Sequence, residues 1–293
     1  MKPNNFKVDQ DKKIMLDTVK KKYTNYLIKI FCGSIILIAY YYVFFKQYGP
    51  DMNKAFHGLK DFFTFITYMF YWKDFFHWPF KYYIGQVLIT IAIVITATTM
   101  GSLVAILLSF LAARTLNKSI WMKPLNLFIR RLFDIFRAVD IAVWGLIFVR
   151  AVGMGPFAGV LAIFIADVGF LGRLFADHHD SLDKKPSKGL DGLGASSIQK
   201  NRFAIFTQSF PQFLSFSLYE IESNIRSAAV LGFVGAGGVG LVYSESMRLW
   251  NWGVVGFITI LLVLVVMLMD KVSSFLRNKY ITGNDIPLYK SNI

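Results

Sequence analysis

Long apolar stretches alternate with short polar ones along this chain. A helix needs roughly 20 mainly apolar residues to cross a bilayer. Six stretches have about that length and character: 26–45, 84–113, 132–149, 157–175, 210–233 and 252–269. The pattern therefore predicts an all-α integral membrane protein with about six transmembrane helices.

Residues 51–83 differ from these stretches because they mix many aromatic residues with charged ones. Phe, Tyr and Trp are interrupted by Lys54, His57, Lys60 and Asp61. Aromatic rings favour the headgroup level of a membrane, and amphipathic helices lie along its surface. We expect an interfacial segment here, with a broken or re-entrant span as the alternative.

Composition and charge support the membrane assignment. The chain of 293 residues is 55% hydrophobic and only 17% charged, whereas soluble domains carry about 25% charged residues. Its net charge of +14 is spread over clusters that flank the apolar stretches: the N-terminus, 114–131, 184–202 and the tail from Lys271. Cytoplasmic loops concentrate such charge, so we expect both termini in the cytosol and no nucleic-acid partner.

The apolar pattern also suggests how the chain is organised. Residues 1–83 are expected to form a basic tail, a first membrane anchor and the aromatic segment. Residues 84–276 are expected to form the main membrane domain, and 277–293 a cytosolic tail. The one cysteine, Cys32, lies in an apolar run, so a disulfide within the chain is excluded.

A polar segment at 177–208 interrupts the apolar pattern. It opens with Asp177, His178, His179 and Asp180, and contains Gly189, Gly192 and Gly194. Glycines break helices, so a turn at Gly194–Ser196 followed by a short amphipathic helix is predicted. Such a helix fits a groove on a soluble partner. The alternative is an ordinary solvated loop.

Two stretches resemble the permease subunits of phosphonate-type ABC importers, binding-protein-dependent components of the inner membrane. They are AVGMGPFAGVLAIFIADVGFLGRLFAD, and GLGASSIQKNRFAIFTQSFPQFLSFSLYEIESNIRSAAVLGFVGAGGVG. The resemblance covers about 84–276 and implies a type I ABC importer permease fold. In that family the cytosolic loop docks on the ATPase through a Glu-Ala-Ala, three residues, Gly pattern.

The docking pattern is only partly kept in this chain. Gly194 matches the glycine, whereas Lys188, Gly189 and Leu190 stand where the family has Glu-Ala-Ala. The resemblance nevertheless implies an ATPase-coupling role for this segment. The residues to which we assign that role are Lys188, Leu190, Gly194, Ala195 and Ser196.

The resemblance also implies the partners and cofactors. They are an ABC ATPase dimer, an extracellular substrate-binding protein, and a second permease copy or a sister permease, all at a bacterial cytoplasmic membrane. ATP and Mg would belong to the ATPase, with no cofactor on this chain. The sequence has no phosphate-binding lysine loop of its own.

The fifth apolar stretch carries ionisable residues, which are costly inside a bilayer and usually face a bundle interior or an aqueous path. Glu222 and Arg226 are four residues apart and can pair on one helix face. Tyr219, Glu222, Asn224 and Arg226 match the family pattern, while Glu220 replaces a usual Arg. We assign Glu222, Asn224 and Arg226 to the pathway or its gate. The alternative is a structural ion pair near the outer interface.

Residues 232–240 read GFVGAGGVG. They contain the spacing of a dinucleotide-binding loop, but the strand, helix and acid that such a loop requires are missing. In the resembling family this segment ends the fifth span near the outer mouth. We therefore assign Gly235, Gly237, Gly238 and Gly240 to a gate, with simple close packing as the alternative.

Further charged and histidine residues are candidates for the span interior or for a metal site. Asp140 and Asp167 are candidates for the span interior, with Arg137 and Asp140 as a plausible pair. Adjacent His178 and His179 point about 100° apart on a helix and make a poor metal chelate. Because no catalytic constellation is found either, neither a metal site nor an enzyme is expected.

The predicted function is therefore that of the permease of an ATP-driven importer for phosphonate or a related phosphorus oxyanion. A permease for methionine or another small solute is the alternative within this class. A self-sufficient secondary carrier is a further alternative, although paired halves, which many carriers contain, are not visible.

Overall fold

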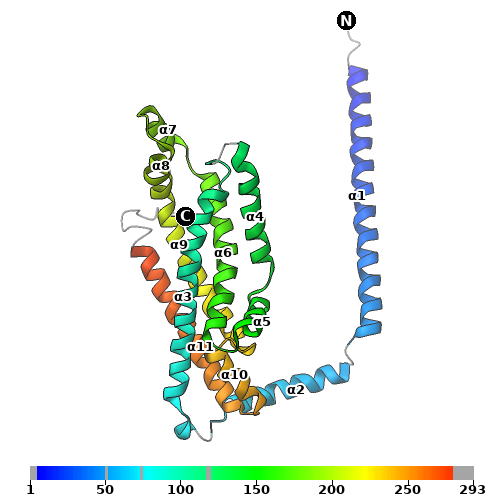
Figure 1. The fold of residues 1–293 in the computed structure, drawn as a ribbon. Helices are drawn as coiled ribbons and strands as arrows, with labels where there is room; N and C mark the ends of the chain where they lie inside the picture. Colours follow the sequence, from blue (N-terminus) through cyan, green and yellow to red (C-terminus); the bar gives the residue numbers. More distant parts are fainter. Residues whose placement is uncertain (1–4, 50–51, 73–74, 117–119, 280–293) are drawn as a thin grey trace, which may run out of the picture. The chain divides into compact units, whose positions relative to one another are not determined.

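The computed structural model describes residues 5–49, 52–72, 75–116 and 120–279, and every regular element in this part of the chain is helical. The chain divides into two units, Met1–Ile66 and Thr67–Ile293. Figure 1 shows the helices coloured along the sequence. The predicted fold class is confirmed. The predicted tail 277–293 lies mostly outside the described residues.

The first unit contains α1 (Asn5–Tyr48) and most of α2 (Met52–Met69). Residues Lys22–Tyr48 of α1 are long and apolar enough to cross a membrane, and none of their most apolar stretch is buried. A helix that is apolar on all sides and unburied suits contact with lipid. The predicted first span, 26–45, falls inside this stretch.

The second unit is built on five long helices and several short ones. The long ones are α3 (Phe80–Ala112), α4 (Lys123–Ala138), α6 (Pro156–Ser181), α9 (Thr207–Phe233) and α11 (Trp252–Arg277). The shorter ones are η1 (Phe75–His77), η2 (Ile120–Met122), α5 (Ile141–Val152), α7 (Lys185–Gly192), α8 (Ser197–Lys200), the π-helical η3 (Asn201–Phe206) and α10 (Val239–Arg248).

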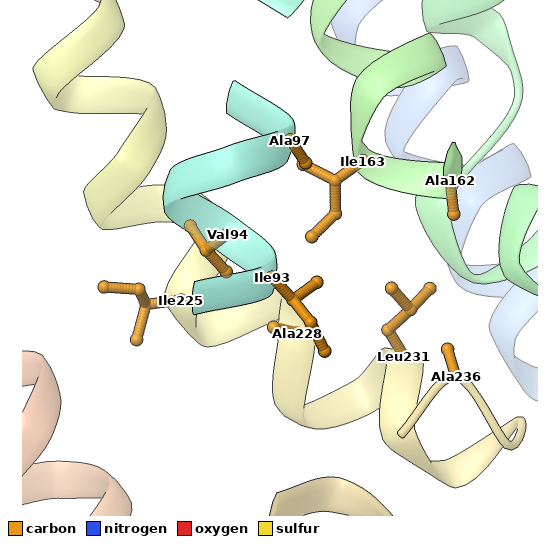
Figure 2. Close-up of a cluster of buried hydrophobic side chains, with 9 residues drawn as sticks. All are labelled: Ile93, Val94, Ala97, Ala162, Ile163, Ile225, Ala228, Leu231 and Ala236. Carbon is orange, nitrogen blue, oxygen red and sulfur yellow. The ribbon is translucent and has the colours of Figure 1, made fainter. Parts of the chain in front are cut away.

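Helices α3, α6 and α9 enclose the core of this unit (Figure 2). Small and branched apolar side chains from all three meet there, together with Ala236 from the turn after α9. They are Ile93, Val94, Ala97, Ala162, Ile163, Ile225, Ala228 and Leu231. Small residues let membrane helices approach closely: a Cβ on Gly101 of α3 would lie 2.9 Å from the Asp167 Cβ of α6.

The predicted third span, 132–149, is wrong as a single helix. Helix α4 ends at Ala138, and α5 begins at Ile141 after an extended Val139. Asp140 is the N-cap of α5: its carboxylate accepts a hydrogen bond of 2.8 Å from the Ala142 N–H. A short acidic side chain at such a position starts a new helix. Asp140 is therefore an exposed cap, not an interior residue, and Arg137 lies near Asp134 instead, at 3.7 Å.

The count of six spans is only partly supported. Four helical stretches of the described residues are long and apolar enough to cross a membrane: Lys22–Tyr48, Phe80–Ala112, Pro156–Ser181 and Trp252–Arg277. Helix α5 is apolar but has only 12 residues. Helix α9 is long enough, but it carries Glu220, Glu222 and Arg226 and is not among the four.

Part of the aromatic segment packs inside the second unit. The rings of Trp72, Phe75 and Trp78 lie 5.4–6.1 Å from one another and from Phe257 of α11. Gly256 permits this approach, because a Cβ there would collide with the Met69 carbonyl. These residues thus pack against the start of α11.

Candidate functional site

Three groups of candidate functional residues are spread along the bundle of the second unit. The first is the connector, residues 182–206, which joins α6 to α9 at one end of the bundle (Figure 1). The second is a buried polar cluster between α3, α6 and α9. The third is the glycine turn at 234–238, which follows α9 at the opposite end.

The connector is shorter than the predicted segment 177–208. Residues 177–181 form the last turn of α6, and 207–208 are already in α9. Arg130 of α4, which is 3% exposed, explains why the polar start of the segment stays helical. Its guanidinium contacts Asp177 at 3.0 Å and also Asp180, and its Nε donates to the Ala112 carbonyl at 2.8 Å. Arg130 therefore ties α3, α4 and α6 together.

Gly194 makes the turn after α7. Its φ of +72° lies in the left-handed region, which favours glycine. The Gly194 N–H donates a hydrogen bond of 3.0 Å to the carbonyl oxygen of Asp191. The Ala195 N–H donates one of 3.1 Å to the carbonyl oxygen of Leu190. This is the Schellman arrangement at a helix end. The helix breaks at Gly194 as predicted, whereas Gly189 remains within α7.

Ser196 begins the next helix with a reciprocal cap. Its N–H donates to Gln199 Oε1 at 2.8 Å, and its hydroxyl accepts from the Gln199 N–H at 3.4 Å. The helix that follows is not a separate one. The backbone continues from α8 through the π-helical η3 into α9, so Ser196 caps a helix that is continuous with a long helix of the bundle.

Apolar side chains are exposed on the connector. Leu193 is 83% exposed and Ile198 is 80% exposed, one on each side of the Gly194 turn. Lys188 is exposed and Leu190 half-buried on the same segment. Sequence reasoning missed Leu193; the available signal was an apolar residue inside an otherwise polar stretch. Exposed apolar residues beside a tight turn are suited to contact a protein partner.

The polar cluster lies deep between three helices. The Asn224 Nδ2 group donates to both carboxylate oxygens of Asp167 and to the Thr98 hydroxyl, each at 2.9 Å. All three residues are at most 3% exposed. Glu220 lies one turn before Asn224 on α9. Buried polar groups require such partners, and a saturated network fixes helix positions.

The predicted pathway residues of α9 therefore fall on different faces. Asn224 is buried in the cluster with Asp167, which was singled out as an interior candidate. Glu222 and Arg226 form the predicted pair, with Arg226 Nη2 at 3.7 Å from Glu222 Oε1, and Arg226 half exposed. Thr98 was missed because a threonine within an apolar run carries no sequence signal of its partner.

Three of the predicted gate glycines lie in a tight turn, and the fourth lies at a close contact between helices. Gly235, Gly237 and Gly238 have φ of +94°, +80° and +72°. The Gly155 N–H donates to the Gly235 carbonyl at 3.0 Å, and the Val239 N–H to the Thr90 hydroxyl at 2.8 Å. The turn is thus held against the starts of α6 and α3.

Gly240 has a packing role. A Cβ on Gly240 would lie 2.1 Å from the Ala229 carbonyl oxygen, so the glycine lets α10 fold back against α9. Close packing therefore explains the glycine at 240. At the other three positions, the positive φ of the backbone favours glycine.

Comparisons with known proteins agree with this arrangement. Residues 105–278 match the family described as "Binding-protein-dependent transport system inner membrane component". The phosphite transport system permease protein PtxC of Stutzerimonas stutzeri is 32% identical over 202 residues, which are 69% of this chain and 72% of that protein.

Two further similarities bear on function and fold. The phosphate-import permease protein PhnE of Mycolicibacterium smegmatis is 33% identical over 192 residues, 66% of this chain but only 36% of that protein's length. Among solved structures, the inward-facing MetNI methionine ABC transporter is similar, with a TM-score of 0.60 and 19% identity over 68% of this chain and 97% of that one. At this identity the similarity shows the fold alone.

Proposed function

The chain belongs to the family of binding-protein-dependent transport system inner membrane components, and on this premise we propose that it is the permease subunit of an ATP-driven importer for phosphonate or a related phosphorus oxyanion. The substrate class is supported by the phosphate and phosphite permeases to which it is about one-third identical. Methionine is less favoured, because the identity to methionine permeases is lower, at 24% or less.

The connector is the observation that carries the coupling role. It exposes Leu193 and Ile198 around the Gly194 turn and continues without interruption into α9. A separate ATPase that grips these side chains would push directly on a helix of the bundle. ATP binding favours one arrangement of the ATPase over another, and that differential affinity is what drives a conformational cycle.

The remaining parts of the proposal concern sidedness and partners. The connector and both chain termini would lie in the cytosol of a bacterial cell, and the chain would pair with a second copy or a sister permease. A substrate-binding protein would deliver the oxyanion at the opposite face, near residues 150–156 and 234–250. ATP and Mg would be held by the ATPase.

The decisive experiment is uptake by reconstituted vesicles. The chain alone should be idle, whereas the chain with its ATPase, its binding protein and ATP should accumulate phosphonate or phosphite. Uptake without any ATPase, or accumulation of methionine in preference to every phosphorus oxyanion, would contradict the proposal.

A further inference from the structure

A cavity of about 210 Å³ lies where the connector meets the bundle. Thr115 and Leu116 line it from the chain after α3, His179 from the end of α6, and Lys184, Ser187 and Lys188 from the start of α7. It is separate from the polar cluster around Asp167 and from the exposed Leu193 and Ile198. The volume is sufficient for several water molecules or one small solute.

His179 is the buried polar group of this cavity. It is 2% exposed, and its ring is held between Phe110 and Phe213, with centroid distances of 4.5 and 5.3 Å. Its Nδ1 lies 3.4 Å from the Ser209 hydroxyl oxygen. Its Nε2 is buried and has no hydrogen-bond partner within the described part of the chain.

The partner at Nδ1 determines what Nε2 requires. When the Ser209 hydroxyl donates to Nδ1, the ring proton is on Nε2, and that N–H needs an acceptor. An unsatisfied buried donor costs about 1–3 kcal/mol. A ligand that supplies an acceptor oxygen in the cavity would remove this cost.

The charges at the cavity favour an anion. Lys184 and Lys188 form no ion pair with any described residue. The two acids that also line it have cationic partners outside the cavity: Asp191 pairs with Lys200, and Asp183 lies 4.0 Å from the Lys185 Nζ.

We propose that this cavity binds a small phosphate-type oxyanion, supplied from the compartment that contains the connector. A bound anion would contact His179 on the bundle and Lys184 and Lys188 on α7. It would hold the connector in the position seen here and slow the transport cycle as oxyanion accumulates. This second step rests on the proposed function, because it assumes that the connector transmits the ATPase movement.

Binding is tested with inorganic phosphate on the purified permease–ATPase complex in phosphatidylcholine nanodiscs, without binding protein or nucleotide. Equilibrium dialysis with labelled phosphate should show one saturable site per permease copy. The double variant Lys184→Ala/Lys188→Ala should weaken it tenfold or more, since charge-assisted hydrogen bonds are the strong ones. Lys123→Ala is the matched control, because Lys123 at the start of α4 is exposed and does not line the cavity.

A second variant addresses the buried donor. His179→Phe keeps an aromatic ring between Phe110 and Phe213 but removes the N–H, and it should weaken phosphate binding as well. The lysines are surface residues, so the double variant remains informative even where His179→Phe reduces folding. Absence of a saturable site, or equal loss in Lys123→Ala, would overturn the proposal.

Two further measurements test where the bound phosphate comes from and what it does to the transport cycle. Loss of phosphate binding in phosphatidylglycerol nanodiscs would assign the cavity to a lipid phosphate and overturn the free-anion assignment. Phosphate should slow ATP hydrolysis by the wild-type complex more than by the Lys184→Ala/Lys188→Ala variant. If oxyanion uptake fails while lysine-dependent phosphate binding persists, the proposed transport function is wrong and the anion site stands. If uptake succeeds but phosphate does not bind in a lysine-dependent way, only the anion site is overturned.

Discussion

At the scale of single residues, two glycines of the connector, Gly192 and Gly194, differ in backbone conformation. A Cβ would meet nothing within 4 Å at either Gly192 or Gly194, but only Gly194 has a positive φ. A side chain would therefore fit at position 194, and it is the backbone conformation that favours glycine there. The same logic separates Asn224, which is fully engaged in a buried network, from the half-exposed Arg226 two residues later.

We expect Gly194→Ala to weaken coupling. An L-residue in the left-handed region costs about 1–2 kcal/mol, so the turn would relax and displace Leu193 and Ile198. The ATPase rate that the binding protein stimulates should fall several-fold, while the amount of protein in the membrane stays normal. Gly192→Ala is the control and should be near wild type; an equal loss in both variants would contradict the role of the turn.

We expect Asn224→Ala to destabilise the bundle by about 1–3 kcal/mol, because it leaves the Asp167 carboxylate buried without its donor. Thermal unfolding in detergent measures the effect. Arg226→Gln on the same helix is exposed and should change stability by about 0.5 kcal/mol or less. A double-mutant cycle with Asp167→Ala should show strong coupling for Asn224, and additive effects there would argue against the network.

At the scale of elements, the connector and the glycine turn both depend on how helices end. The connector exposes two apolar side chains at its turn, and the glycine turn brings α10 back onto α9. The connector is therefore suited to hold a partner, whereas the glycine turn is tightly packed. Each arrangement leads to a prediction with a control elsewhere in the fold.

We expect the double substitution Leu193→Ser/Ile198→Ser to reduce retention of the ATPase during co-purification, because it removes the exposed apolar contact. The effect should be at least tenfold if these residues are central to the interface. Leu249→Ser is the control: Leu249 is similarly exposed, at 78%, but follows α10 at the opposite end of the bundle. Full retention by the double variant would rule out this docking surface.

We expect Gly240→Ala to destabilise the packing of α10 against α9 by about 1–3 kcal/mol, because the added methyl group collides with the Ala229 carbonyl. Gly85→Ala on α3 serves for comparison, since a Cβ there meets nothing within 4 Å. That change should be neutral or slightly stabilising, because alanine favours a helix over glycine. Unfolding midpoints of the two variants give the contrast.

At the scale of the whole molecule, the connector and the α10–α11 link lie at opposite ends of the bundle (Figure 1). This sets a topology that labelling can test. In a Cys32→Ser background, Leu193→Cys should react with a membrane-impermeant reagent only from the cytosolic side, and Leu249→Cys only from the outer side. Labelling of both sites from one side would contradict six crossings with both termini inside.

Much of the architecture follows from the sequence by itself. Hydrophobic length is enough to locate α1, α3, α6 and α11, because a span must satisfy its backbone within the helix. The turn at Gly194 was also predictable, since glycine there follows a helical pattern. The Glu222–Arg226 pair followed from spacing on one helix. These are local properties, and neighbouring residues alone determine them.

The remainder was decided by tertiary structure. The pairing of Asp167 with Asn224 and Thr98, and of Arg130 with Asp177 and Asp180, joins residues that are far apart in the sequence. Contacts between distant segments arise only when the helices pack, so no local pattern specifies them.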